Sequence, residues 1–310
     1  MATSQQFLVC DSSTLANFKS WAQAISTMFT TAGWTQTSDT GQVNWSSIAS
    51  VPGSGAFVYE IWRANDGLGF TDYYVKIEYG NVSGTNCPSI RLTMGIGSNG
   101  AGTLTGFITN TYNVNFSSFT PASSTTTYEC NFSYATGRFA AMMWRNGPGN
   151  SQQFFAFERS VNASGTYVGT SVTMLVCGAA SGSFSASVPA IQQSILFGVG
   201  TSPALANSSR TNALGNSSGW NCRLCVTSTS LLNGNVAMDT VAPLTGYNDW
   251  GLTVAGVALG SDVIEGTTFS TTLYGATRTY MVTKAGPFSG AAGPCVTAGT
   301  GSAALLMRFD

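Results

Sequence analysis

The first regular pattern of apolar residues along the chain has a helical period. Apolar residues recur at spacings of three and four, at Leu15, Phe18, Ala22, Ile25 and Phe29, and this period places them on one helix face. The Asp11–Ser13 cluster can cap the N-terminus of the helix and Gly33 can end it. The opposite face is polar and is expected in solvent: Asn17, Lys19, Gln23, Ser26 and Thr30. We therefore expect a helix that covers a sheet.

After Gly33 the pattern changes to a period of two, which is typical of half-buried strands. In Asp72–Tyr79, four apolar residues share one face, whereas Lys76 and Glu78 share the other. Similar segments predict further strands over Phe57–Arg63, Ser89–Met94, Phe139–Trp144, Gln153–Arg159, Tyr167–Val176, Gln193–Phe197, Arg223–Thr227, Leu252–Leu259, Thr268–Tyr274, Thr279–Thr283 and Ala304–Phe309. Clusters of Gly, Asn, Ser and Pro separate these segments, and Asn162–Gly165 is typical of a hairpin turn.

Together these elements predict a mainly β fold, in which the N-terminal amphipathic helix packs on antiparallel sheets in a sandwich-like arrangement. We expect one or two β domains. A helix-plus-antiparallel-sheet domain covers residues 1–180, and residues 181–310 form a β-rich second domain or a continuation of the first. The boundary is expected near Gly178–Ser187, where the residues are small and flexible. Residues 201–219 are rich in Asn and Ser and predict a long loop, or an arm that reaches a neighbouring molecule.

The composition narrows the functions open to such a fold. The 310 residues include no histidine, and 8% are charged against roughly 25% in typical soluble domains. Histidine is the usual general base, triad member and metal ligand, so its absence removes most enzyme mechanisms. The formal net charge of −1 provides no electrostatic footprint for nucleic acid or an anionic membrane, and its weak self-repulsion suits an assembly subunit. No apolar run is long enough to span a membrane, and no secretory signal pattern is visible.

The seven cysteines predict free thiols rather than a metal site or disulfides. They are scattered along the chain, at Cys10, Cys87, Cys130, Cys177, Cys222, Cys225 and Cys295. With cytosolic synthesis, buried free thiols are expected. Cys222 and Cys225 form a C-x-x-C motif, but structural zinc needs four ligands, and the chain has neither a second such pair nor a histidine. On a strand, the two thiols would also point to opposite faces.

A glycine-rich segment matches a nucleotide-binding motif without its context. Gly95–Gly100 fits the dinucleotide fingerprint G-x-G-x-x-G and follows a predicted strand. The motif also needs a helix after the glycines and an acidic residue about 20 positions on, where Thr120 stands. We expect a glycine-rich turn and no cofactor.

Two acids raise the possibility of glycoside hydrolysis, which can be carried out by a pair of carboxylates. Glu60 and Glu78 are placed on the polar faces of predicted strands, each near a base, Arg63 or Lys76. Cross-strand charge pairing on a solvated sheet face explains them more simply. The other acids considered lie in turn-like segments without a calcium-loop pattern: Asp66, Asp72 and Asp249. We therefore expect no catalytic, cofactor-binding or metal-binding residue.

The chain is rich in aromatic residues, most of which are expected in the core. Trp220 and Trp250 are flanked by Gly, Asn and Asp, and they are the best candidates for exposed contacts with a partner or receptor. On exposed loops, such side chains could also stack on sugars.

A resemblance to a known family is carried by sequence blocks that are spread over most of the chain: Phe18–Ala22, Ala32–Val43, Tyr59–Asp66, Val75–Gly80, Met94–Gly102, Phe155–Ser160, Thr272–Tyr280 and Leu306–Asp310. In these blocks the chain resembles a family of virion proteins of tailed bacteriophages. The resemblance implies a structural component of the particle, near the tail, and it transfers no catalytic residue. Cys222–Cys225 and residues 201–219 are not matched by it.

We therefore expect a non-enzymatic virion protein, synthesised in the host cytoplasm and acting by oligomeric assembly. Its partners would be further copies of itself and other virion proteins, in a tail fibre, a fibre base or the baseplate periphery. A host-surface glycan is a further candidate partner, whereas nucleic acid is not expected. Two alternatives stay open: a capsid decoration or cement protein, and a glycan-binding protein or depolymerase.

Overall fold

The structure, a computed structural model, is mainly β with antiparallel sheets, as the sequence predicts, and its described residues include one helix. It describes residues 2–82, 86–109, 111–116, 127–145, 152–161, 165–177, 191–196, 204–209, 222–232, 236–243, 252–259, 264–273, 276–287 and 302–310. Within these ranges, no helix is both long and apolar enough to cross a membrane.

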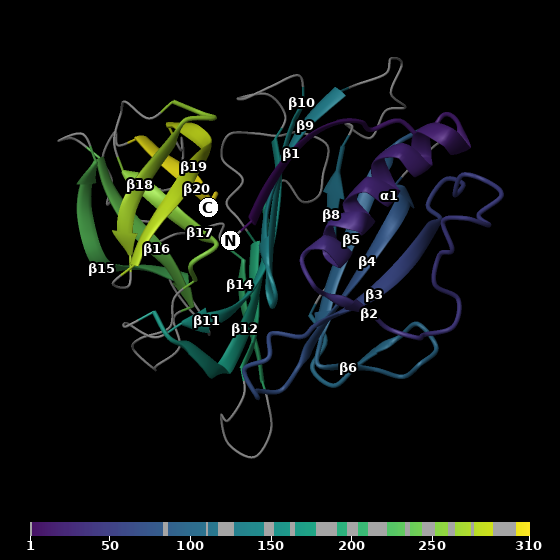
Figure 1. The fold of residues 1–310 in the computed structure, drawn as a ribbon, viewed down its shortest axis with the longest axis horizontal. Coiled ribbons are helices and arrows are strands. Elements are labelled where there is room, and N and C mark those ends of the chain that lie inside the picture. The colour runs from purple at the N-terminus through teal and green to yellow at the C-terminus, as the bar shows by residue number, and fades with distance from the viewer. Residues whose placement is uncertain are drawn as a thin grey trace.

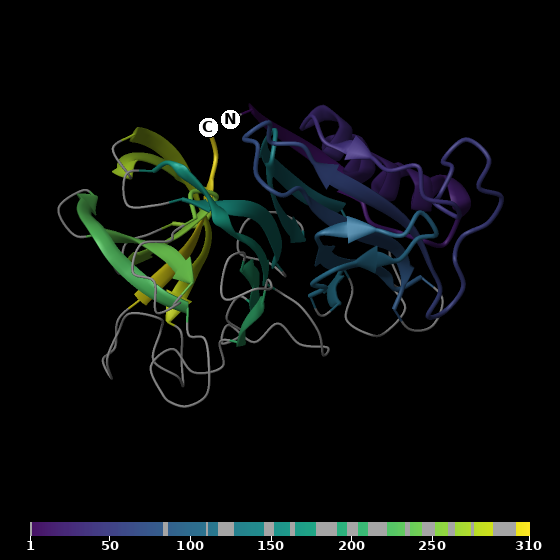
Figure 2. The ribbon, with the colours of Figure 1, turned by 90° about the horizontal axis from the view of Figure 1, so that it is seen from below.

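The three larger antiparallel sheets of the described residues lie next to one another, with the seven-stranded sheet in the middle (Figures 1 and 2). Its strands, in spatial order, are β1 (Ala2–Val9), β9 (Thr127–Ala135), β10 (Arg138–Arg145), β11 (Gln152–Val161), β12 (Tyr167–Cys177), β13 (Ile191–Leu196) and β14 (Ala204–Ser209). The five-stranded sheet runs β2 (Thr35–Gln36), β3 (Phe57–Ala64), β4 (Tyr73–Asn81), β5 (Pro88–Gly95) and β8 (Tyr112–Asn115). The six-stranded sheet runs β15 (Cys222–Leu232), β16 (Val236–Pro243), β17 (Ala255–Leu259), β20 (Ser302–Arg308), β19 (Ala276–Pro287) and β18 (Thr268–Leu273).

The predicted helix is present as α1 (Leu15–Thr31). Its cap is Thr14, not the predicted Asp11–Ser13 cluster: Thr14 Oγ1 accepts a hydrogen bond from the Asn17 amide at 3.2 Å. The Asp11 carboxylate instead accepts from the Ser13 amide, just before the helix. Gly33 follows the helix with φ +78°, a conformation that favours glycine. One residue of the polar face was predicted wrongly: Ser26 is buried, because its hydroxyl meets a carboxylate in the interior.

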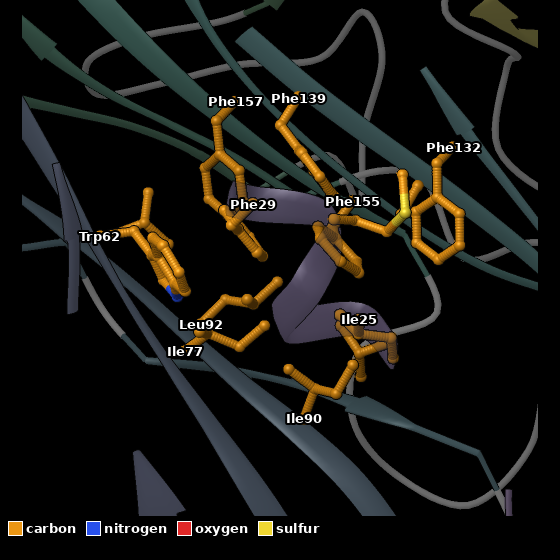
Figure 3. Packing of buried hydrophobic residues seen from close by; sticks show 14 of the residues in the cluster. Ile25, Phe29, Trp62, Ile77, Ile90, Leu92, Phe132, Phe139, Phe155 and Phe157 are labelled. Atoms are coloured by element: carbon orange, nitrogen blue, oxygen red, sulfur yellow. The ribbon is translucent and has the colours of Figure 1, made fainter. Parts of the chain in front are cut away.

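The main hydrophobic core combines side chains from α1 with side chains from the five- and seven-stranded sheets. The ring of Phe29 stacks on Phe139 of β10 with centroids 4.3 Å apart, and on Trp62 of β3 at 5.6 Å. Figure 3 shows Phe29 and Ile25 between side chains of the two sheets. The buried face of α1 therefore contacts both sheets.

The predicted strands all overlap observed ones, but the alternation missed five longer strands: β1, β8, β9, β14 and β16. The seven-stranded sheet also continues past residue 181, because β12 pairs with β13 and β13 with β14. Strand β14 lies inside residues 201–219, where a loop was expected. The rest of that stretch and the expected boundary at Gly178–Ser187 lie outside the described residues, so the division into domains stays a prediction.

Candidate functional site

Glu60 is a buried carboxylate held by four neutral donors. It is 1% exposed and lies on the interior face of β3. Its Oε1 accepts hydrogen bonds from Ser26 Oγ at 2.8 Å and Trp45 Nε1 at 2.7 Å. Its Oε2 accepts from Trp62 Nε1 at 3.2 Å and Tyr79 OH at 3.1 Å. The carboxylate therefore ties α1, β3, β4 and the loop before β3 together.

The prediction that Glu60 takes part in charge pairing on a solvated face is wrong. Residue 60 stands opposite Ile77 in the β3–β4 ladder, and the side chain of Ile77 is in the core. Burial raises the pKa of Glu60, and the four hydrogen bonds only partly oppose this rise. Arg63 instead lies 3.8 Å from Asp72.

Glu60 and Glu78 cannot act together as a catalytic pair. Glu78 alternates with the buried residues of β4 and stands opposite Tyr59, so it lies on the other face of the sheet from Glu60. Its carboxylate lies 3.8 Å from Lys76 Nζ, so Glu78 pairs with a charge as predicted, but the partner is on the same strand and the predicted cross-strand pairing is wrong. The sheet itself separates the two acids.

The sequence analysis missed a second buried carboxylate, Glu158 of β11. Its oxygens accept hydrogen bonds from the amides of Thr253 at 2.6 Å and Val254 at 2.9 Å, and from Tyr167 OH at 3.0 Å. Arg138 lies 3.9 Å away. Thr253 and Val254 directly precede β17 of the six-stranded sheet, so this carboxylate links two sheets. The pattern of β11 could not indicate this link, because Thr253 and Val254 are about 95 residues away in the chain.

A third acid, Asp66, anchors the connection between β3 and β4. Its Oδ2 lies 2.7 Å from Nε of Arg159, and both side chains are buried. Arg159 also donates to the Thr71 carbonyl at 2.9 Å, so one guanidinium holds both ends of the loop. The apolar side chains of Leu68 and Phe70 are exposed between these anchors.

The glycine-rich segment forms a turn, as predicted. Short strand β6 (Gly97–Ser98) lies inside the segment and pairs with β7 (Leu104–Thr105), and the described residues that follow, up to 109, contain no helix. Gly102 has φ +84°, and a Cβ there would lie 2.0 Å from the hydroxyl of Tyr59. The Asp39 carboxylate accepts hydrogen bonds from Ser98 Oγ and from the Gly102 amide. The segment is thus fixed by its own chain and offers no helix N-terminus for a phosphate.

The cysteines whose side chains are described carry buried thiols rather than disulfides, as predicted: Cys10, Cys87 and Cys130. Burial raises the pKa of the Cys10 and Cys130 thiols, which keeps them protonated and poorly nucleophilic. Cys222 and Cys225 lie on β15, but their side chains are not described. Searching the described residues finds no cluster of three or more His, Cys, Asp or Glu that could hold a metal ion.

The candidate contact residues Trp220 and Trp250 lie outside the described residues, as does Asp249. Their roles stay predictions.

The edge strand β1, which was not predicted from the sequence, exposes one large apolar side chain, Phe7. β1 lies at one end of the seven-stranded sheet and pairs with β9 over eight residues. Its sequence, ATSQQFLV, contains no charged residue and no proline. Phe7 is 67% exposed, whereas Leu8 is buried against the core. Such an edge is a ready template for pairing with another strand.

No protein-family model matches this chain, and comparisons with curated proteins and with solved structures found no match. The function is therefore to be inferred from the residues and the geometry of the chain itself.

Proposed function

We propose that this protein is a structural component of a tailed bacteriophage particle, associated with the tail and acting by oligomeric assembly. The low content of charged residues and the sequence blocks that resemble phage virion proteins support this function. A surface that is polar through hydroxyl and amide groups suits interfaces that do not depend on ion pairs screened by salt. We further propose a sandwich-like arrangement with α1 packed on its antiparallel sheets, for which the Phe29 contacts are the support.

The observation that carries the proposal is the uncharged edge of β1 with its exposed Phe7. A monomer that circulates freely commonly protects such an edge with a charge, a proline or a bulge. A subunit that is covered by neighbours needs none of these. The buried acids agree with an assembly role, because the hydrogen bonds of Glu60 and Glu158 are directed to the protein's own side chains and backbone.

The experiment that tests this function is quantitative mass spectrometry of purified particles separated into heads and tails. We expect a few to a few dozen copies per particle, in multiples of three or six, in the tail fraction. Hundreds of copies in the head fraction would instead identify a decoration or cement protein. If the chain is missing from both fractions, the structural role is wrong, and glycan binding or depolymerase activity becomes the first alternative.

A further inference from the structure

We propose that the free edge of β1 pairs with the same edge of a second copy of this chain, so that two seven-stranded sheets join into one. This inference rests on the proposed assembly function and specifies the interface. Because each two-fold pair holds two copies, it selects multiples of six among the copy numbers expected there. Among the described strands, β1 pairs only with β9. Alternate backbone N–H and C=O groups along its other edge therefore face away from β9, and no described strand pairs with them.

Nothing in the sequence of β1 opposes such pairing. The strand is eight residues long, close to the usual length of a strand in a sheet. Its register with β9 is continuous from Ala2 to Val9, so no bulge twists the edge away. It also has no lysine or proline, the residues that commonly block edges.

The neutrality of β1 favours a second copy as the occupant. Two identical strands that pair antiparallel are related by a two-fold axis, and each residue then meets a residue from the same strand. A charged strand would place like charges close together in this arrangement, which is destabilising. β1 carries no charge, so this penalty is absent.

The exposed residues also suggest a register. Side chains directly opposite each other in an antiparallel pair share one face of the sheet. Thr3, Gln5 and Phe7 are all exposed and alternate along β1, so they share a face. A two-fold axis centred on Gln5 places Gln5 opposite its equivalent and Thr3 opposite Phe7. This register covers the exposed Phe7 rings at both ends of the pair.

The first test is the mass of the purified full-length chain in solution, by analytical ultracentrifugation. We expect a dimer that Gln5→Lys weakens at least tenfold, because two ammonium groups then meet at the axis. The substitution is compatible with the fold, since Gln5 Nε2 already donates to the Glu129 carboxylate at 2.9 Å. The matched control is Gln23→Lys on the exposed face of α1, which should leave the dimer intact.

The second test is the register, through disulfide formation between introduced cysteines. Under mild oxidation, Gln5→Cys should give a covalent dimer on a non-reducing gel. Thr3→Cys alone should not, because Phe7 stands opposite it. A mixture of Thr3→Cys and Phe7→Cys chains should crosslink. The unsubstituted chain, treated identically, controls for the native cysteines.

A chain that stays monomeric at about 100 µM, a concentration at which a Kd of about 1 µM would leave it mostly dimeric, overturns the inference. A dimer that Gln5→Lys leaves unchanged and Gln5→Cys fails to crosslink also overturns it, since another surface then forms the contact. Particle composition reports separately on the proposed function. A dimer with the predicted crosslinks, made by a chain that is absent from particles, supports this interface and refutes the virion role. A monomeric chain that is present in tails supports the virion role and refutes this interface.

Discussion

At the scale of single residues, the environment of Glu60 shows why a charged residue in an alternating strand need not face water. β3 has apolar side chains on both faces, so its period of two does not say which face is interior. The four donors decide the question. They come from α1, β3, β4 and the loop before β3, and together they compensate the carboxylate for its loss of hydration.

We predict that Glu60→Ala lowers the free energy of unfolding by at least about 2 kcal/mol, because it leaves several buried donors without their acceptor. The matched control is Glu78→Ala on the opposite face of the same sheet, which should change stability by less than about 1 kcal/mol. Urea denaturation followed by tryptophan fluorescence measures both values. Equal losses in the two variants would show that the Glu60 network contributes little.

The raised pKa of Glu60 predicts a pH dependence of stability. A glutamate in the unfolded chain has a pKa of about 4.3, and burial places the pKa of Glu60 in the folded chain above its ordinary value. Between these two values the folded chain binds more protons than the unfolded chain, so this residue's contribution to stability falls as pH rises. We expect the stability of the unsubstituted chain, minus that of Glu60→Gln, to be highest near pH 4 and to decrease towards neutral pH. A difference that increases with pH would mean that the folded pKa is lowered.

At the scale of elements, α1 contributes stability through the aromatic contacts of its buried face. Phe29 is the clearest case, because its ring stacks on one residue from each of two sheets. We predict that Phe29→Ala costs about 3–5 kcal/mol, the usual range for a buried phenylalanine. Thr30→Ala, on the exposed side of the same helical turn, should change stability by less than about 0.5 kcal/mol. Thermal and urea unfolding measure the loss in free energy of unfolding for both variants. Similar losses would exclude α1 as a main contributor to the stability of the core.

The elements also differ in how much of them could be predicted from sequence. α1 and β4 have one apolar and one polar face, so their period identifies both the element and its orientation. β1 was missed because only Leu8 among its residues is buried, which leaves no apolar alternation to detect. The residues of the candidate site were harder still to predict from the sequence. Ser26 lies on the polar side of the helical pattern, and its burial depends on Glu60, 34 residues away in the chain.

At the scale of the whole molecule, the contacts between sheets depend on a few polar anchors. Glu158 binds the segment before β17, and Trp144 of β10 donates to the Thr283 carbonyl of β19 at 3.0 Å. Tyr280 of β19 donates to the Thr253 carbonyl at 2.9 Å. The Glu158 and Trp144 bonds join the seven-stranded sheet to the six-stranded sheet, on the side away from α1 (Figure 1), whereas the Tyr280 bond holds the segment before β17 to β19 within the six-stranded sheet. Such a junction can loosen without disrupting the α1 core.

We predict that Glu158→Ala loosens this junction locally. The amides of Thr253 and Val254 lose their acceptor, and we expect their hydrogen exchange to accelerate at least about tenfold, which corresponds to roughly 1.4 kcal/mol. Exchange in β4 and β5 should stay slow, because their core lies on the other side of the seven-stranded sheet. Glu78→Ala, which removes a carboxylate far from the junction, should leave the exchange of both amides unchanged. Uniform acceleration throughout the chain would instead mean that Glu158 supports the whole fold, so that the two sheets unfold as one cooperative unit.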